Sequence, residues 1–203
     1  MNKPKINGLI VAAGLSGRMK SFKPLADYKG KSFIINIILK LEVICDQIFI
    51  VTGHKEDDLK SAVINDLTKA NQTVLLKKIE FVYNESYEKG MFTSLQKGIS
   101  AARNCDWILY HFVDQPGLPD FFYNDFILQI DIQHNWIQPS YKDKNVHPIL
   151  IKSDFFDLIT NSPPESSLRE INKNPIVKRK FWECDYKEIF QDIDTDEDFS
   201  KLL

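Results

Sequence analysis

Short apolar runs alternate with amphipathic stretches through the first half of the chain. Four runs rich in β-branched and aromatic residues predict buried strands, at residues 6–12, 47–52, 79–83 and 107–113. Three stretches with apolar residues at helical spacing predict helices between them, at residues 33–41, 56–67 and 93–103. Because strands that alternate with helices form βαβ units, we expect a three-layer α/β/α sandwich with a mixed, mainly parallel sheet.

The second half has a different pattern, with shorter elements and more strand signals. Strands are predicted at residues 136–139, 147–151, 181–184 and 188–191. Helices are predicted at residues 120–132, 153–159, 165–171 and 195–203, with Asp120 and Ser153 as N-caps. We expect a single domain over residues 1–203, in which an α/β half at about 1–116 precedes a half at about 117–203 with a β-rich insertion over the ligand edge.

Composition and charge narrow the class of protein. The chain has 203 residues, of which 43% are hydrophobic and 27% charged, and its formal net charge is -2. Without an overall basic field, neither nucleic acid nor an anionic membrane is expected as a partner. The three cysteines are far apart and form no C-x-x-C pair, so they predict buried, reduced thiols. With no signal-peptide pattern and no apolar run of about 20 residues, we expect a cytoplasmic protein.

The loop after the first predicted strand has the composition of an anion-binding turn. The small residues Ala-Ala-Gly at 12–14 let the backbone approach a ligand closely. Gly14 and Gly17 are expected to take positive φ and to present N–H groups as an anion nest. Arg18 and Lys23 add positive charge beside those groups, a combination that suits a triphosphate. The loop lies at the carboxyl edge of the sheet, where open α/β sheets bind ligands.

Two common phosphate-binding motifs are excluded, although an ordinary βα turn remains an alternative for this loop. The dinucleotide motif G-x-G-x-x-G is absent because Ser16 stands where its second glycine would be. Gly30-Lys31-Ser32 is similar to the end of a P-loop, but Leu25 occupies the position of the first glycine that a P-loop requires.

Five segments, in order along nearly the whole chain, resemble the MobA-like nucleotidyltransferases. They lie at residues 12–19 with 23–25, 90–95, 114–116, 147–148 and 192–199. The first resembles the signature of the whole superfamily. The combination is similar to the branch of molybdenum cofactor cytidylyltransferases. The resemblance implies the nucleotide-diphospho-sugar transferase type of fold.

The resemblance also implies a role for each matching residue. The NTP would be bound by Ala12, Ala13, Gly14, Ser16, Arg18, Lys23 and Ser94. Within this set, Ala12, Ala13 and Ser94 would line the base pocket, and Lys23 would stabilise charge at the α-phosphate. Asp114 and Asp194 would hold Mg²⁺, and His147 would lie near the acceptor. Arg18, Lys23 and Asp114 are the catalytic candidates.

The implied reaction is Mg²⁺-dependent transfer of CMP from CTP to a phosphorylated acceptor, with release of pyrophosphate. CTP is favoured because the guanylyl branch has Ala-Gly-Gly where this chain has Ala-Ala-Gly at 12–14, and because Thr93-Ser94 follows. Molybdopterin is the leading acceptor, with a molybdoenzyme or its chaperone as a partner. A sugar-1-phosphate or phosphoalcohol acceptor and a non-catalytic nucleotide or pterin carrier are the alternatives. Three residues depart from the family pattern. Val146 replaces the glycine before His-Pro, on the acceptor side. Lys20 replaces the glycine after Arg-Met, and Asp196 replaces the proline of the last segment.

The chemistry of the residues agrees with these roles and leaves structural alternatives. Asp114 ends a predicted strand and precedes Pro116, which directs its carboxylate to the ligand edge, and Mg²⁺ prefers carboxylate oxygens. A turn-forming role is the alternative for Asp114, and an N-cap role is the alternative for Asp194, with Thr195 as the rival cap. His111 lies within an apolar strand and is expected to be a core histidine with satisfied hydrogen bonds.

Overall fold

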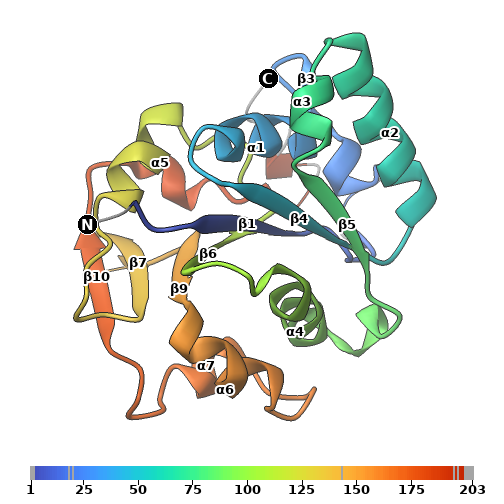
Figure 1. The fold of residues 1–203 in the computed structure, drawn as a ribbon. Coiled ribbons are helices and arrows are strands. Elements are labelled where there is room, and N and C mark those ends of the chain that lie inside the picture. The colour runs from blue at the N-terminus through green and yellow to red at the C-terminus, as the bar shows by residue number, and fades with distance from the viewer. Residues whose placement is uncertain are drawn as a thin grey trace.

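One mixed sheet organises the chain (Figure 1). The computed structural model describes residues 3–17, 19, 21–142, 144–193, 195 and 197–198. Within them, eight strands form the sheet in the order β10-β7-β9-β6-β1-β4-β5, with β8 paired to β7. The strands are β1 Ile6–Val11, β4 Gln47–Thr52, β5 Ile79–Tyr83, β6 Trp107–Phe112, β7 Trp136–Tyr141, β8 Lys144–Asn145, β9 Ile149–Lys152 and β10 Arg179–Glu183. A separate hairpin joins β2 Asp27–Tyr28 to β3 Lys31–Ser32.

Strand direction confirms the expected mixed, mainly parallel sheet. The β1 strand is parallel to β4 and β6, β4 is parallel to β5, and β10 is parallel to β7. The β9 strand is antiparallel to both of its neighbours, β6 and β7. Val11 is in register with both Val51 and Phe112, so β1, β4 and β6 end at one edge. The loops that follow these strands therefore meet at that edge.

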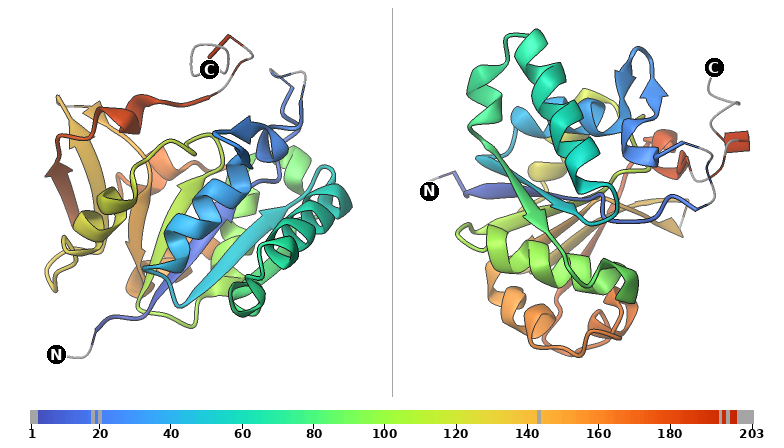
Figure 2. Two further views of the ribbon diagram at one scale, coloured as in Figure 1. Left: turned by 90° about the horizontal axis from the view of Figure 1, so that it is seen from above. Right: turned by 90° about the vertical axis from the view of Figure 1, so that its right-hand side faces the viewer.

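Helices cover both faces of the sheet, as Figures 1 and 2 show. On one face lie α1 Phe33–Glu42, α2 Glu56–Lys69, α3 Thr73–Leu76 and α5 Asp120–Ile127. On the other lie α4 Met91–Ala102, α6 Phe156–Thr160 and α7 Leu168–Ile171. Four short 3-10 turns complete the described elements: η1 Lys23–Leu25, η2 Tyr87–Lys89, η3 Ser153–Phe155 and η4 Lys187–Phe190. No helix in these ranges is both long and apolar enough to cross a membrane.

Alternation along the strands supplies a separate apolar core to each helical layer. In β1, Ile6 and Ile10 pack into the core beneath α1, whereas Leu9 packs into the core of α4. The same alternation divides Ile50 from Val51 in β4, since successive strand residues point to opposite faces. Both faces of the central strands are therefore buried, which explains why their sequences are nearly continuous apolar runs.

Gly98 brings α4 unusually close to the sheet. A Cβ atom at this position would lie 2.4 Å from Cδ1 of Leu9 and 2.8 Å from Cγ2 of Val51. Only glycine leaves room for this approach. The close packing holds the middle of α4 against β1 and β4.

The predicted elements of the first half are confirmed to within about two residues at each end, whereas the second half needs corrections. The strands expected to form an insertion over the ligand edge instead extend the main sheet as β7, β9 and β10. The helix expected at 120–132 ends at Ile127. Residues 188–191 were expected to be a strand, but η4 is a 3-10 turn.

Two predicted helix caps are also wrong. Pro119 occupies the N-cap position of α5, so Asp120 lies inside the first turn, and Phe155 rather than Ser153 precedes α6. A cap that the sequence analysis missed begins α7, where Ser167 and Glu170 form a reciprocal capping box.

Candidate active site

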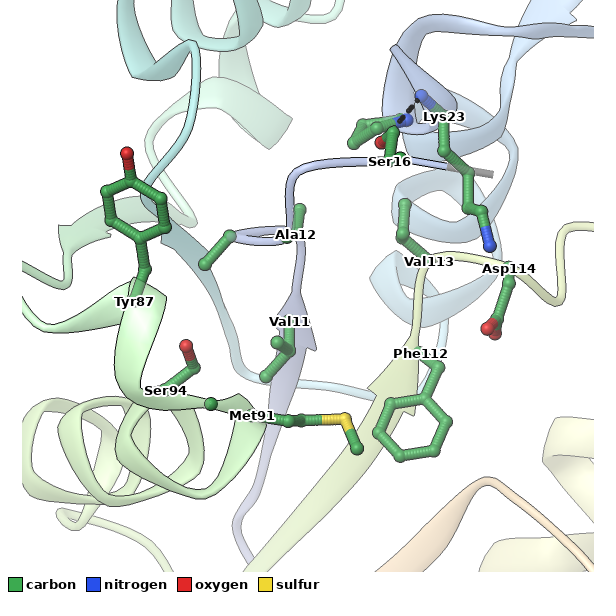
Figure 3. A pocket seen from close by; sticks show the side chains of 15 residues that line it. Val11, Ala12, Ser16, Lys23, Tyr87, Met91, Ser94, Phe112, Val113 and Asp114 are labelled. Atoms are coloured by element: carbon green, nitrogen blue, oxygen red, sulfur yellow. Dashed lines mark hydrogen bonds between the residues drawn. The ribbon is translucent and has the colours of Figure 1, made fainter. Parts of the chain in front are cut away.

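A cavity of about 430 Å³ opens at the carboxyl ends of β1 and β6, beside the first turn of α4 (Figure 3). Its wall is formed by Val11, Ala12, Ala13, Gly14, Ser16, Gly17, Lys23, Pro24, Tyr87, Gly90, Met91, Ser94, Phe112, Val113 and Asp114. Six predicted nucleotide-binding positions, at residues 12, 13, 14, 16, 23 and 94, are therefore brought together with Asp114. The volume of the cavity is within the usual range of about 300–1,000 Å³ for small-molecule sites.

The first loop is shaped differently from the expected nest. Neither Gly14 nor Gly17 has positive φ, and the left-handed residue is Ser16, with φ of 54°. The Ser16 side chain accepts a hydrogen bond of 3.1 Å from the Lys23 backbone N–H, and its carbonyl accepts one of 3.0 Å from Met19. This loop therefore folds back on itself through Ser16, an unusual conformation for a serine.

The two glycines of the loop have open space at the position that a side chain would occupy. A Cβ atom at Gly14 or Gly17 would meet no other heavy atom within 4 Å. Both residues also line the cavity. A ligand can approach the backbone there as closely as the sequence pattern requires.

A cation and a carboxylate lie on the same side of the cavity. Lys23 begins η1, just after the first loop, and its side chain extends toward Asp114 in Figure 3. Asp114 follows β6 by two residues and is half-buried. Its backbone carbonyl accepts a hydrogen bond of 2.9 Å from Ile193, which joins the strand end to the last described segment of the chain. The arrangement suits a phosphate that needs both a cation and a metal-binding carboxylate.

Gln115 holds this junction together, and the sequence analysis gave it no role. Its buried amide nitrogen donates to the Ile189 carbonyl over 3.0 Å and to Asp192 Oδ1 over 2.7 Å. On the other side of the turn, the Lys40 ammonium donates to the Pro116 carbonyl. Burial lowers the pKa of Lys40 to about 8. The turn that carries Asp114 is thus held from both sides.

Asn84 is a second residue whose role the sequence did not reveal. It lies just after β5, is buried, and donates from Nδ2 to Thr93 Oγ1 over 3.0 Å and to Ser94 Oγ over 2.9 Å. Its Oδ1 accepts from the Ser86 N–H over 3.0 Å. The only available signal was its place directly after a predicted strand. Asn84 therefore connects the lip of the cavity to the first turn of α4.

His147 lies beside the cavity and is not among its lining residues. Its ring centroid is 3.8 Å from that of Phe112, which does line the cavity. Burial lowers the pKa of His147 to about 4, so the ring is neutral near pH 7. The structure therefore packs His147 against a residue of the cavity wall.

His111 has the environment expected of a core histidine. It is fully buried, with Nδ1 2.6 Å from the Phe112 carbonyl oxygen and Nε2 2.7 Å from the Tyr123 hydroxyl. The carbonyl fixes the proton on Nδ1, so the Tyr123 hydroxyl donates to Nε2. Burial lowers the pKa of His111 to about 3.

Two candidate residues, Arg18 and Asp194, lie outside the described residues, as do Lys20 and Asp196. Next to Asp194, Thr195 forms a reciprocal cap with Asp198: its hydroxyl donates to Oδ2 over 2.8 Å and accepts from the Asp198 N–H over 3.1 Å. Thr195 therefore takes the capping role that was the structural alternative for Asp194. Within the described ranges, no group of three or more His, Cys, Asp or Glu side chains is placed to hold a metal ion.

Comparison with known proteins gives a consistent result. Residues 8–178 match the family described as the MobA-like NTP transferase domain. The molybdenum cofactor cytidylyltransferase of Escherichia coli K12 is 27% identical over 197 residues, which cover 96% of this chain and 93% of the relative.

Solved structures share the fold at lower identity. Rv0371c of Mycobacterium tuberculosis, in complex with manganese, superposes with a TM-score of 0.74 at 17% identity, covering 98% of both chains. A CMP:2-keto-3-deoxy-manno-octonic acid synthetase in complex with CTP superposes with a TM-score of 0.76 at 14% identity, covering 98% of this chain and 96% of the other.

Proposed function

The chain belongs to the family of MobA-like NTP transferase domains, and on that premise we propose that it transfers CMP from CTP to a phosphorylated small molecule. Membership makes the chain an NTP nucleotidyltransferase, which speaks against the carrier alternative. The observation that carries the finer proposal is the single cavity shared by the first loop, Lys23, Ser94 and Asp114. We also propose that residues 1–203 act as one domain, since β9 from the second half pairs with β6 from the first.

CTP is proposed as the donor on two grounds. The small residues at 12 and 13 and the Ser94 hydroxyl line one part of the cavity, where a flat base with polar edges would fit. The relative named as a cytidylyltransferase matches nearly the whole chain. In this arrangement, Gly14, Ser16 and Arg18 would hold the triphosphate, and the open space beside Gly14 supports that placement.

The reaction requires an acceptor oxygen to attack the α-phosphorus in line with the leaving pyrophosphate. Both reactants are anions, so positioning and neutralisation of charge are the main contributions of the protein. Lys23 would stabilise the charge that develops on the α-phosphate oxygens, and the backbone of the first loop would orient the β- and γ-phosphates. No covalent nucleophile from the protein is required.

Mg²⁺ is the proposed cofactor, and the residues present fit it. Asp114 offers carboxylate oxygens on the cavity wall, and magnesium is usually held by one or two carboxylates together with substrate phosphates and water. Asp194 is the proposed second ligand. This is supported by the neighbouring Ile193, which donates to the Asp114 carbonyl, and by Thr195, which caps the following turn with Asp198. The ion would neutralise phosphate charge and bring donor and acceptor oxygens together.

Molybdopterin remains the leading acceptor, supported by the name of the relative that matches 96% of the chain. The resemblance assigned His147 to this acceptor. Because His147 packs against Phe112 and is not among the lining residues, we propose that it acts on the acceptor only by holding that ring. A molybdoenzyme or its chaperone would then receive the product.

The nucleotide proposal is tested by thermal unfolding with CTP, GTP, ATP or UTP, each with Mg²⁺. CTP is expected to raise the melting temperature most, because a ligand that binds only the folded state stabilises it. Pyrophosphate release is then measured with molybdopterin, sugar-1-phosphates and phosphoalcohols. A larger shift with GTP would contradict the choice of CTP, and turnover with a sugar-1-phosphate alone would replace the acceptor.

The metal proposal is tested with Asp114→Asn, which keeps the size of the side chain and removes its charge. Because a metal supplies several kcal/mol at the transition state, kcat/KM should fall by about 10²-fold or more. Asp120→Asn is the matched control, since Asp120 is an exposed carboxylate on α5 outside this cavity. Full turnover by Asp114→Asn would refute the metal role.

A further inference from the structure

The β10 strand forms one edge of the sheet, and among the described residues β7 is the strand that pairs with it (Figure 1). Its hydrogen bonds to β7 involve the even-numbered residues. The Lys178 carbonyl accepts from Trp136, and the Cys184 N–H donates to the Ser140 carbonyl. Since a parallel ladder repeats every two residues, the N–H and C=O groups of Arg179, Phe181 and Glu183 point away from β7.

The side chains of these three residues also share one face, and all three are exposed. Phe181, at the centre of the strand, leaves 46% of its surface in solvent. Lysines often protect an edge strand from pairing. The lysine inside β10, Lys180, lies on the opposite face, where its ammonium donates to the Gln129 carbonyl and to Asp131. It does not guard this face of the edge.

Three further exposed apolar side chains belong to segments next to β10 in space or in sequence. Leu128 and Ile132 are 77% and 84% exposed, and the Lys180 contact with Gln129 brings their segment next to β10. Ile176 is 55% exposed and just precedes the strand. An unpaired strand edge is a template for pairing with another chain, and exposed apolar residues near it would add buried area to such a contact.

We propose that two copies of this chain associate through β10, as antiparallel strands related by a two-fold axis at Phe181. In this register Phe181 lies opposite Phe181 of the second copy, and Arg179 lies opposite the second copy's Glu183. All outward-facing N–H and C=O groups of the three residues then pair, because they fall on hydrogen-bonded positions of an antiparallel ladder. Two Arg–Glu pairs of opposite charge lie opposite each other across the junction, and opposite charges at such positions are favourable. Each Glu183 carboxylate also accepts hydrogen bonds within its own chain, from the Ser140 hydroxyl and from the Lys142 N–H, and these hold the exposed carboxylate at the end of the strand.

Charge complementarity selects a second copy over an unrelated partner. In a closed two-fold contact both copies use the same surface, so that surface must be complementary to itself. In the β10 sequence Arg-Lys-Phe-Trp-Glu, the opposite charges of Arg179 and Glu183 lie two residues on either side of Phe181 and meet this condition. The pairing would join the two sheets into one continuous sheet. The cavity is lined from β1, η1, η2, α4, β6 and the adjoining loops, and no β10 residue is among its lining residues.

The oligomeric state is tested by sedimentation velocity and light scattering over a range of protein concentrations. The expected particle has twice the 23.6 kDa mass of one chain. A mass of 23.6 kDa at every concentration up to the solubility limit would overturn the proposal.

The register is tested by charge reversal. Arg179→Glu alone places Glu opposite Glu in a homodimer, and Glu183→Arg alone places Arg opposite Arg, so each variant should be monomeric. An equimolar mixture of the two variants restores both opposite-charge pairs and should recover the doubled mass. Lys173→Glu is the matched control, because it reverses an exposed charge outside β10 and should remain dimeric.

Two outcomes count against the proposal once the circular dichroism of each variant confirms folding. Dimers of either single variant would show that β10 is not the contact. A mixture that stays monomeric would show that the antiparallel register centred on Phe181 is wrong.

Discussion

The Asn84 side chain donates to the Ser94 hydroxyl oxygen over 2.9 Å, and this bond leaves the Ser94 proton available to a ligand in the cavity. Asn84 is itself held by the Ser86 N–H and by Thr93, so its orientation is determined by its neighbours. Ser94 is therefore presented as a hydrogen-bond donor. A donor at this position suits a base carbonyl oxygen, as cytosine has.

Replacing Asn84 by Asp should weaken CTP binding by about 5- to 10-fold, since one hydrogen bond contributes about 1 kcal/mol net. A carboxylate only accepts, so the Ser94 proton would turn toward residue 84 and away from the ligand. Calorimetric titration measures the change. Combining Asn84→Asp with Ser94→Ala should cost little more than either alone, and full additivity would contradict the coupling of the two residues.

The charge of Lys23 should matter more than its packing. Lys23→Met keeps a long apolar side chain and removes the ammonium, so affinity for the triphosphate should fall by about 10- to 100-fold, the value of a charge-assisted hydrogen bond of about 1.5–3 kcal/mol. Affinity for cytidine, which has no phosphate, should change little. Lys31→Met, in the exposed β3 strand, is the matched control. Equal losses for CTP and cytidine would point to a damaged fold.

Two glycine-to-alanine changes should have opposite signatures. Gly98→Ala drives a methyl group into Leu9 and Val51, so it should lower the free energy of unfolding by about 1–3 kcal/mol, as overpacking does. Gly14→Ala meets no protein atom within 4 Å, so it should leave stability nearly unchanged and weaken nucleotide binding. Urea unfolding and CTP titration separate the two effects. Strong destabilisation by Gly14→Ala would contradict the open space beside it.

Burial of His111 should make stability fall with acidification. Its folded-state pKa is lowered to about 3, whereas an unfolded histidine titrates near about 6.5. The unfolded state therefore binds the extra proton first. The contribution is complete above about pH 6.5 and is lost as the pH falls toward the folded pKa, at about 1.4 kcal/mol per pH unit.

Urea unfolding at several pH values between about 6 and 5 measures this slope. The His111→Asn variant should lose stability overall and show a slope smaller by about 1.4 kcal/mol per pH unit. An unchanged slope would mean that His111 accepts a proton while the protein remains folded.

Local patterns were sufficient to predict the sheet strands and the longer helices of the first half, but not the β2–β3 hairpin or the short helix α3. The apolar run at the start of the chain became β1, and the helical spacing from Phe33 became α1, because each element is buried on the face that its pattern indicated. The helices and strands of the second half are shorter, and their conformation depends more on tertiary contacts. Residues 188–191 have the composition of a strand, but most of them form the 3-10 turn η4. The Ile189 carbonyl in this turn accepts a hydrogen bond from Gln115, which is 74 residues earlier in the chain.

The candidate site likewise contains residues that a local motif identified and residues that only tertiary contacts reveal. Residues that line the cavity with small or charged side chains, such as Gly14 and Lys23, were recognisable from their motif. Asn84 and Gln115 act by holding other residues in place, and a single sequence has no pattern for such contacts. The left-handed conformation fell on Ser16 instead of the glycines, since the bond from Lys23 to its side chain stabilises that turn.

The clamp at Gln115 has a consequence for when the enzyme becomes competent during its synthesis. The acceptors of its amide lie 74 and 77 residues later in the chain, at Ile189 and Asp192. On the ribosome, the first loop, β1 and β6 can all be in place while the turn at Asp114 still lacks its support. The proposed nucleotide-binding loop can therefore form before the turn at Asp114 is supported, and turnover waits until the segment with Ile189 and Asp192 has been made and has folded back onto Gln115.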